Sequence, residues 1–176
     1  MNNWNHAIET VLRREGGFVD NPNDPGGATK YGISLRWLSQ RGMIGDFDGD
    51  GDVDVDDIRV MDRDQAMLIY RNNWWDRYGY GGIHDEWTAT KIFDMSVNMG
   101  ASQAHKLVQR ALTVSGQPVV DDGIFGPATL KAVNLAETCL FEGAVKATQA
   151  AFYRQLVEKN PKLAEFKDGW LFRASC

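Results

Sequence analysis

The chain has 176 residues, 43% of them hydrophobic, which is enough to bury the core of one domain, or of a small domain with a closely docked subdomain. Its formal net charge is −5, but seven of its 24 acidic residues fall between positions 46 and 57, where Lys and Arg are absent. Elsewhere, the 19 basic and 17 acidic residues are nearly balanced, which excludes the basic surface of a nucleic-acid-binding protein. No apolar run is long enough to predict a membrane-spanning segment.

Apolar residues recur at helical spacing along most of the chain, and the alternating runs typical of strands are scarce. Gly16 ends the first predicted helix, and Pro127 suits a first helical turn. Asp62 with Gln65 three residues later indicates a capping box. The pattern therefore predicts an all-α or α-dominated fold, with a small hairpin in the glycine-rich stretch 16–33. In chain order, the expected helices cover residues 4–15, 34–38, 55–60, 62–74, 87–99, 104–112, 127–133 and 138–159.

Glu15 lies at the C-terminal end of the first predicted helix and on its apolar face. It follows Val11 by four residues and Leu12 by three, which places these side chains on one side of the helix. Burial and the helix dipole at this end both disfavour a charged carboxylate, as suits a general acid that must hold a proton. The alternative interpretation is a half-exposed acid that is neutralised by its neighbours Arg13 and Arg14.

The segment after Glu15 is rich in residues that bend the chain. Five of the eleven residues from 22 to 32 are glycine or proline, which is unfavourable unless the backbone turns tightly or approaches a ligand closely. The run from Glu15 to Ile33, which begins Glu-Gly-Gly-Phe and closes Lys-Tyr-Gly-Ile, closely resembles the signature of glycoside hydrolase family 108, phage and prophage muramidases whose catalytic glutamate opens a Glu-Gly-Gly segment. This resemblance implies a lysozyme-like helical fold in which Glu15 protonates the glycosidic oxygen between N-acetylmuramic acid and N-acetylglucosamine of bacterial peptidoglycan.

The resemblance also implies a second catalytic group in the loop after Glu15. Phage-type lysozymes pair the glutamate with an aspartate and a threonine there, and the counterparts in this chain are Asp24 and Thr29, with Asp20 as an alternative aspartate. Only four residues separate Asp24 from Thr29, one fewer than in the phage lysozyme pattern. Asp24 also suits a turn before Pro25. If Asp24 activates a water on the opposite face of the sugar, its carboxyl should lie about 6.5–9.5 Å from that of Glu15, and the anomer should invert.

Two downstream segments resemble known families. Residues 93–100, Phe-Asp-Met-Ser-Val-Asn-Met-Gly, are similar to a segment of family 108, which implies that Asn98 hydrogen-bonds the sugar. Packing at a helix end ahead of Gly100 is the alternative role of Asn98. Residues 121–129 resemble the Asp-Gly-x-Phe-Gly-Pro-x-Thr turn of peptidoglycan-binding modules, and this turn implies either wall binding or the N-terminus of a helix in a helical subdomain.

The acid-rich stretch 46–57 matches the twelve-residue EF-hand template. Gly51 supplies the turn at position six, and Val53 at position eight is the apolar side chain that turns inward. Because Gly45 directly precedes the loop while residues 55–60 form an exiting helix, the arrangement resembles the one-sided calcium loops of dockerins. We expect a structural Ca²⁺, with a solvated acidic loop as the alternative. The expected ligands are Asp46, Asp48, Asp50, Asp52 through its carbonyl, Asp54 and Asp57.

Aromatic residues gather among glycines between positions 74 and 87. Sugar rings stack their apolar faces on aromatic side chains, which suits part of this cluster to glycan binding, whereas core packing accounts for most aromatic residues in any domain. The expected substrate contacts are Trp74, Trp75 and Tyr78.

These patterns together predict a monomeric endolysin-type N-acetylmuramidase whose partner is bacterial peptidoglycan. We expect a catalytic region at 1–95, which includes the calcium loop, and a helical peptidoglycan-domain-like region at 96–176, docked as one compact unit. The first residues lack a secretory signal and only two cysteines occur, so we expect synthesis in the host cytoplasm and holin-type release to the periplasmic cell wall. A lytic transglycosylase that uses the same glutamate and a non-catalytic, calcium-dependent wall-binding protein are the alternatives.

Overall fold

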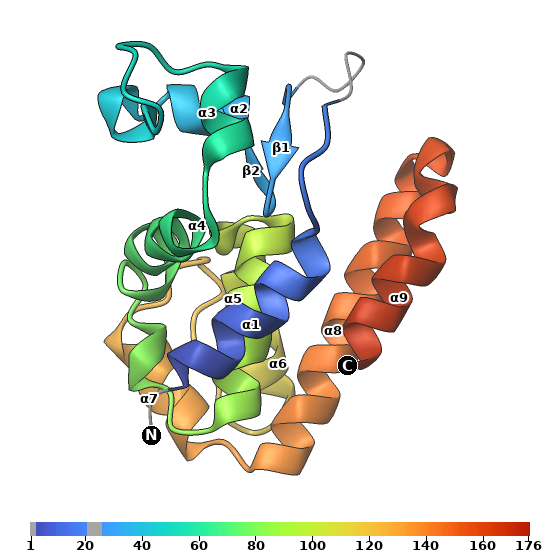
Figure 1. The fold of residues 1–176 in the computed structure, drawn as a ribbon. Coiled ribbons are helices and arrows are strands. Elements are labelled where there is room, and N and C mark those ends of the chain that lie inside the picture. The colour runs from blue at the N-terminus through green and yellow to red at the C-terminus, as the bar shows by residue number, and fades with distance from the viewer. Residues whose placement is uncertain (1–2, 21–25) are drawn as a thin grey trace. The chain divides into compact units, whose positions relative to one another are not determined.

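The computed structural model describes residues 3–20 and 26–176 of the chain (Figure 1). Asp24 therefore lies outside the described residues. The chain divides into two compact units, residues 1–77 and residues 78–176. Helices dominate both units, and the described part of the chain contains one short two-stranded sheet. These observations confirm the predicted α-dominated fold with a small hairpin.

The first unit contains the predicted hairpin and the acid-rich loop. Its elements in chain order are α1 (Trp4–Glu15), β1 (Thr29–Lys30), β2 (Ile33–Ser34), α2 (Leu35–Ser39), the 3₁₀ turn η1 (Gly42–Gly45), α3 (Val55–Val60), α4 (Arg63–Tyr70) and the π-helical turn η2 (Arg71–Trp75).

Side-chain caps fix the helix starts that the sequence predicted. The Ser34 hydroxyl accepts a hydrogen bond from the Trp37 backbone N–H at 3.3 Å and begins α2. Asp62 and Gln65 form the reciprocal capping box that opens α4. A short 3₁₀ turn, rather than a full entering helix, precedes the acid-rich loop, as the sequence indicated. Local signals therefore account for the short helices of this unit.

The hairpin is antiparallel and gains a third backbone segment. Thr29 pairs with Ser34 and Lys30 with Ile33. Val19, in the segment after α1, exchanges two backbone hydrogen bonds of 2.8 Å with Thr29, and Figure 1 shows this segment running beside β1. The end of α1 is thereby tied to the hairpin through the main chain.

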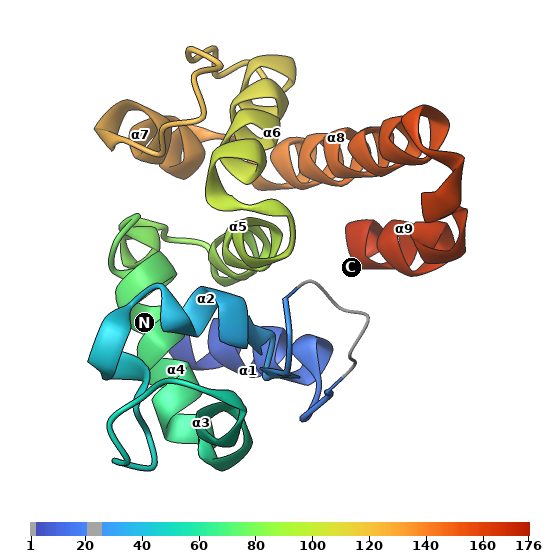
Figure 2. The same ribbon diagram turned by 90° about the horizontal axis from the view of Figure 1, so that it is seen from above.

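The second unit is helical throughout its regular structure. Its elements are the 3₁₀ turn η3 (Tyr80–Gly82), α5 (Glu86–Met99), α6 (Ala101–Val114), α7 (Pro127–Leu135), α8 (Thr138–Lys159), the 3₁₀ segment η4 (Pro161–Phe166) and α9 (Lys167–Ser175). Figure 2 shows the chain reversing after α8, so that α9 runs back beside it. None of the helices that the structure describes combines the length and the apolarity needed to cross a membrane.

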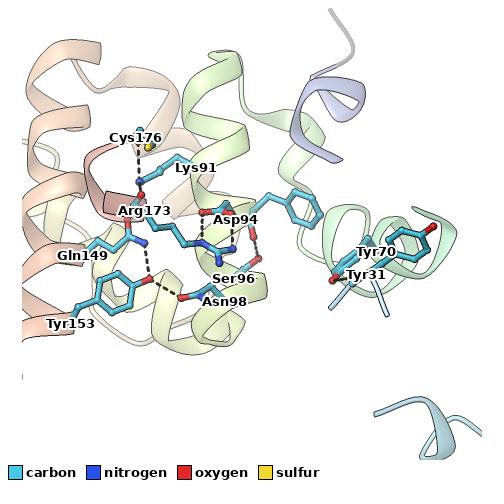
Figure 3. A network of polar contacts seen from close by, with 11 residues as sticks. Tyr31, Tyr70, Lys91, Asp94, Ser96, Asn98, Gln149, Tyr153, Arg173 and Cys176 are labelled. Atoms are coloured by element: carbon cyan, nitrogen blue, oxygen red, sulfur yellow. Dashed lines mark hydrogen bonds and ion pairs between the residues drawn. The ribbon is translucent and has the colours of Figure 1, made fainter. Parts of the chain in front are cut away.

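Helix α9, which the sequence did not predict, is attached to α5 by buried polar contacts (Figure 3). The Arg173 guanidinium makes two hydrogen bonds to the Asp94 carboxylate, at 2.8 and 3.1 Å, and Asp94 is 0% exposed. The buried Lys91 ammonium donates to the backbone carbonyls of Arg173, Ala174 and Cys176 at 2.7–3.2 Å. A cation is favoured at a helix C-terminus, so Lys91 caps α9 from a neighbouring helix.

Candidate active site

Glu15 is the last residue of α1, where the helix ends and the chain turns toward the hairpin. Its side chain is half-buried. Gly32, in the turn between β1 and β2, packs directly on it: a Cβ built at Gly32 would lie 2.9 Å from both Cβ and Cγ of Glu15. Gly32 also has a φ of +76°, a conformation that side chains disfavour. This position therefore requires glycine both for space and for backbone geometry.

Tyr70, at the end of α4, also contacts this turn. Its hydroxyl donates a 2.8 Å hydrogen bond to the Tyr31 carbonyl (Figure 3), and a Cβ at Gly32 would approach that hydroxyl to 2.7 Å. The Tyr31 N–H donates to the Gly16 carbonyl at 3.2 Å, which ties the turn to the end of α1. Tyr31 has a φ of +52°, and non-glycine residues in this region of backbone space gather at functional sites.

Two further predicted residues, Thr29 and Asp20, lie in or beside the same hairpin. Thr29 is in β1 and half-buried, and its hydroxyl donates to the Gly27 carbonyl at 3.3 Å. Asp20 is exposed and follows Val19, the residue that pairs with Thr29. Asp24 lies outside the described residues, so its catalytic role stays a prediction.

The acid-rich loop is organised around the buried carboxylate of Asp57, which is 1% exposed. One carboxylate oxygen accepts hydrogen bonds from the backbone N–H groups of Phe47 at 2.6 Å and Asp48 at 3.3 Å. The other accepts from the Asp54 N–H at 2.8 Å and completes the capping box of α3. Asp57, the twelfth residue of the loop, therefore joins its beginning to its end.

The remaining carboxylates converge in two groups. Carboxylate oxygens of Asp46, Asp48 and Asp50 lie within 4.8 Å of one another, as do those of Asp52, Asp54 and Asp57. An N–H bond from Asp50 lowers the pKa of Asp48, but desolvation and the charges of Asp50, Asp57 and Asp46 together raise it above its usual range. The charge of Asp50, with desolvation and further neighbouring acids, raises the pKa of Asp52. Such repulsion is relieved by a bound cation, so these residues fit a divalent metal ion.

Helix α3 connects this loop to the hairpin beside Glu15. The Lys30 ammonium, in β1, donates a 2.6 Å hydrogen bond to the backbone carbonyl of Arg59 near the end of α3. The Arg59 guanidinium in turn lies 5.5 Å from the centroid of the Phe18 ring. Phe18 and Lys30 belong to the two paired segments that follow α1, so the exit of the loop is attached to both.

An aromatic ladder extends from Tyr70. Its ring lies 5.3 Å from that of Trp74, which stacks at 5.5 Å and 24° on Trp37 of α2. The guanidinium of Arg41 lies 3.5 Å from the centroid of the Trp37 ring. We define the aromatic ladder as Arg41, Trp37, Trp74 and Tyr70. Trp75 is instead 4% exposed and packs edge-on against Trp4, so packing accounts for its position.

Two predicted substrate contacts belong to the second unit. Asn98 is half-buried near the end of α5, and its side-chain oxygen accepts a 2.7 Å hydrogen bond from the Tyr153 hydroxyl (Figure 3). Gln149 donates to that hydroxyl at 3.0 Å. Tyr78 is half-exposed and contacts the edge of the buried His105 ring at a centroid distance of 5.0 Å.

Sequence reasoning missed Gly32, Tyr70, Trp37 and Arg41. The concentration of glycines indicated that the backbone approaches something closely, but gave no means of choosing Gly32. Tyr70 lies inside the helix predicted at 62–74, and its hydroxyl partner is 39 residues away along the chain. No periodic pattern carries that information.

Comparison with known proteins matches the chain to two family models. Residues 8–100 match the family model described as Glycosyl hydrolase 108, and residues 103–175 match the one described as Predicted Peptidoglycan domain. Among solved structures, the chain is similar to that of Brucella abortus SagA, with 27% sequence identity and a TM-score of 0.74 over 98% of this chain and 89% of SagA. The search of curated proteins gave no match.

The first family match covers more than half of the chain and includes Glu15, the hairpin and the acid-rich loop. The two matches follow the order that the sequence resemblance implied, and the similarity to a solved structure agrees with the expected helical, lysozyme-like fold. The chain therefore belongs to the glycosyl hydrolase 108 family and is a glycoside hydrolase that acts on peptidoglycan.

Proposed function

We propose that this hydrolase is an N-acetylmuramidase that cleaves the β-1,4 bond between N-acetylmuramic acid and N-acetylglucosamine, with Glu15 as the general acid. The setting of Glu15 is the observation that carries the proposal: it ends α1, is half-buried, and has its methylene groups against Gly32. A general acid must lie within hydrogen-bond reach of the leaving oxygen and keep that position. The turn held by Tyr70 supplies a rigid support for such a group.

The second catalytic group in this proposal is Asp24, which activates water on the opposite face of the sugar and gives an inverted product. Asp20 is the alternative base. Thr29 assists from β1, where backbone bonds on both sides fix its position. Determining the anomer of the first product by NMR tests this assignment, because a retained anomer excludes direct attack by a water on the opposite face of the sugar.

We further propose that residues 46–57 bind a structural Ca²⁺ through Asp46, Asp48, Asp50, Asp54 and Asp57 and the Asp52 carbonyl. The two convergent groups of carboxylates, and the raised pKa values of Asp48 and Asp52, support this assignment. When bound, a divalent cation neutralises the mutual repulsion of these acids. Lys30 of the hairpin donates a hydrogen bond to the Arg59 carbonyl at the exit of the loop. An ordered loop therefore also stabilises the hairpin beside Glu15.

For the glycan we propose contacts from Asn98, Trp74 and Tyr78, each of which is partly exposed to solvent. The Tyr153 hydroxyl donates to the Asn98 oxygen, which leaves the Asn98 amide N–H groups as donors. Trp75 is buried, so we assign it to the core rather than to substrate. The turn at 121–129 is the proposed wall-binding element of the second unit.

The biological setting that we propose is lysis of a bacterial host by a phage or prophage endolysin. A monomer is made in the host cytoplasm and acts on the periplasmic cell wall after holin-type release. The same chemistry would serve an effector delivered to rival bacteria, and the genes that flank the coding sequence distinguish these settings.

Loss of turbidity of purified sacculi, with mass analysis of the released fragments, tests the proposed activity. Wild type should clear the suspension and release reducing N-acetylmuramic acid ends, whereas Glu15→Gln should not. Glu9→Gln is a matched control, because Glu9 is on the same helix, is exposed, and pairs with Arg63 on the surface. It should retain full activity.

The alternatives predict different results in the same experiment. A lytic transglycosylase releases 1,6-anhydro ends in place of reducing ends. A non-catalytic wall-binding protein gives no lysis, and its binding to sacculi is unchanged in Glu15→Gln. Either result refutes the muramidase assignment.

A further inference from the structure

The aromatic ladder ends in a guanidinium group rather than in an open ring face. Arg41 lies over the Trp37 ring at 3.5 Å, and Trp37 also stacks on Trp74. The guanidinium covers a face of the Trp37 ring, so this end of the ladder does not offer that face to a sugar. What it presents to a ligand is the set of N–H donors of Arg41, which recognises carboxylate or phosphate groups.

Three contacts hold Arg41 in place. Its backbone N–H donates to the Leu38 carbonyl at 2.9 Å, one guanidinium nitrogen donates to the Trp37 carbonyl at 3.2 Å, and the guanidinium stacks on the Trp37 ring. A guanidinium has five N–H donors, so most remain available for a ligand. Because the side chain is already ordered, ligand binding loses less conformational entropy than it would at a free surface arginine.

The charge around Arg41 also favours an anion. Desolvation, followed by the positive charge of Arg77, lowers the pKa of Arg41. No carboxylate within residues 3–20 and 26–176 forms an ion pair with Arg41. Two cations near one another are a source of repulsion that an anionic ligand relieves.

We propose that Arg41, supported by Trp37 and with Arg77 nearby, forms a subsite for a carboxylate group of the glycan substrate. This inference rests on the proposed muramidase function and extends it to substrate selection. Trp74 and Tyr70 continue the ladder to the turn that contacts Glu15, so packed side chains of the same unit join the subsite to the catalytic acid. Peptidoglycan has two sources of such carboxylates: the stem peptide, or the lactyl group of muramic acid where the peptide has been removed.

Calorimetric titration in a Glu15→Gln background tests the subsite, because the ligand is then not consumed. The probes are peptide-bearing glycan oligomers, peptide-free oligomers with a free lactyl carboxylate, and both oligomers after amidation of their carboxylates. Arg41→Met should raise the Kd for a carboxylate-bearing oligomer about tenfold, and amidation should weaken binding by a similar factor. Arg36→Met is the matched control, because Arg36 lies on α2 and is exposed, and this variant should leave the Kd within about twofold.

The oligomer that shows the Arg41 dependence identifies the source of the carboxylate. Dependence with peptide-bearing oligomers alone assigns the stem peptide, and dependence with peptide-free oligomers alone assigns the lactyl group. The melting temperatures of the variants show whether they are folded, and Arg41→Lys replaces Arg41→Met if the latter is unstable. Arg41→Lys keeps the positive charge but lacks the planar guanidinium, so it should bind the oligomers more weakly than the chain with Arg41.

Equal Kd values for Arg41→Met and Arg36→Met with every oligomer would overturn the subsite, as would binding that is insensitive to amidation. Hydrolysis of sacculi is measured separately with Glu15 intact. Absence of hydrolysis together with Arg41-dependent binding would refute the muramidase and leave the subsite standing. Hydrolysis without Arg41-dependent binding would refute the subsite and leave the muramidase standing.

Discussion

Replacing Gly32 with alanine tests whether the turn between β1 and β2 positions Glu15, the proposed catalytic acid. The added Cβ would lie 2.7 Å from the Tyr70 hydroxyl and 2.9 Å from Cβ and Cγ of Glu15, whereas ordinary contacts begin at 3.4 Å. One or both neighbours must therefore move by about half an ångström. The φ of +76° adds about 1–2 kcal/mol for a residue with a Cβ, and loss of the bond from Tyr70 to Tyr31 adds about 0.5–1.5 kcal/mol.

We therefore expect Gly32→Ala to lower the free energy of unfolding by about 2–4 kcal/mol, within a total of about 5–15 kcal/mol, so that the chain still folds. Because a displacement of about 1 Å in an active site lowers the rate about a hundredfold, we expect kcat to fall at least about tenfold. Urea unfolding followed by tryptophan fluorescence measures the first quantity, and the initial rate of sacculus clearing at saturating substrate measures the second.

Gly17→Ala is the control for this experiment. Gly17 follows the end of α1, has no heavy atom within 4 Å of a built Cβ, and lacks a positive φ. It should change stability by less than about 1 kcal/mol and leave kcat unaltered. If Gly32→Ala matched Gly17→Ala in both measurements, the turn would not position Glu15. Adding Tyr70→Phe to Gly32→Ala removes the closest contact, so it should restore part of the lost stability.

Three further predictions concern the loop and the second unit. Asp57→Asn should abolish the rise in melting temperature between chelator and calcium, because Asp57 is the buried closing carboxylate, whereas Asp56→Asn should keep it; equal shifts in both variants would remove Asp57 from the proposed metal site. Arg173→Met should lower the unfolding free energy by about 3 kcal/mol in urea titration, because it leaves the buried Asp94 without its cation, and a loss below 1 kcal/mol would contradict a stabilising role for the pair. Burial lowers the pKa of His105 below its unfolded value near 6.5, so its contribution to stability is complete above that pH and is lost as pH falls below it; His105→Gln should reduce the loss of stability between pH 7 and pH 5, and identical pH profiles would refute this.

The sequence predicted those parts of the fold whose causes are local. Ser34 and the capping box of Asp62 and Gln65 act within three residues, and each begins a helix where expected. Helix α9 is different, because its attachment depends on pairing between Arg173 and Asp94, which are 79 residues apart. Gly169 within α9 also weakens its helical pattern. Long-range ion pairs of this kind leave no periodic trace in one sequence.

The residues of the candidate site also fall into those with a local signal in the sequence and those without one. Glu15 could be proposed from the sequence because a helical stripe and a glycine-rich signature meet at this residue. The supports of Glu15 were not, since Gly32 and Tyr70 matter through the few atoms that they bring into contact. The guanidinium of Arg41 on Trp37 is similarly a matter of side-chain geometry, and spacing alone predicts only that the two residues lie one helical turn apart.

The packing of Gly32 on Glu15 has a consequence for the catalytic cycle. Gly32 contacts the methylene carbons of the side chain, and those carbons have the same shape whether the carboxyl has kept or given up its proton. In the reaction that we propose, this contact is the same before Glu15 gives up its proton and after, so the support from Gly32 does not depend on the charge of the carboxyl group.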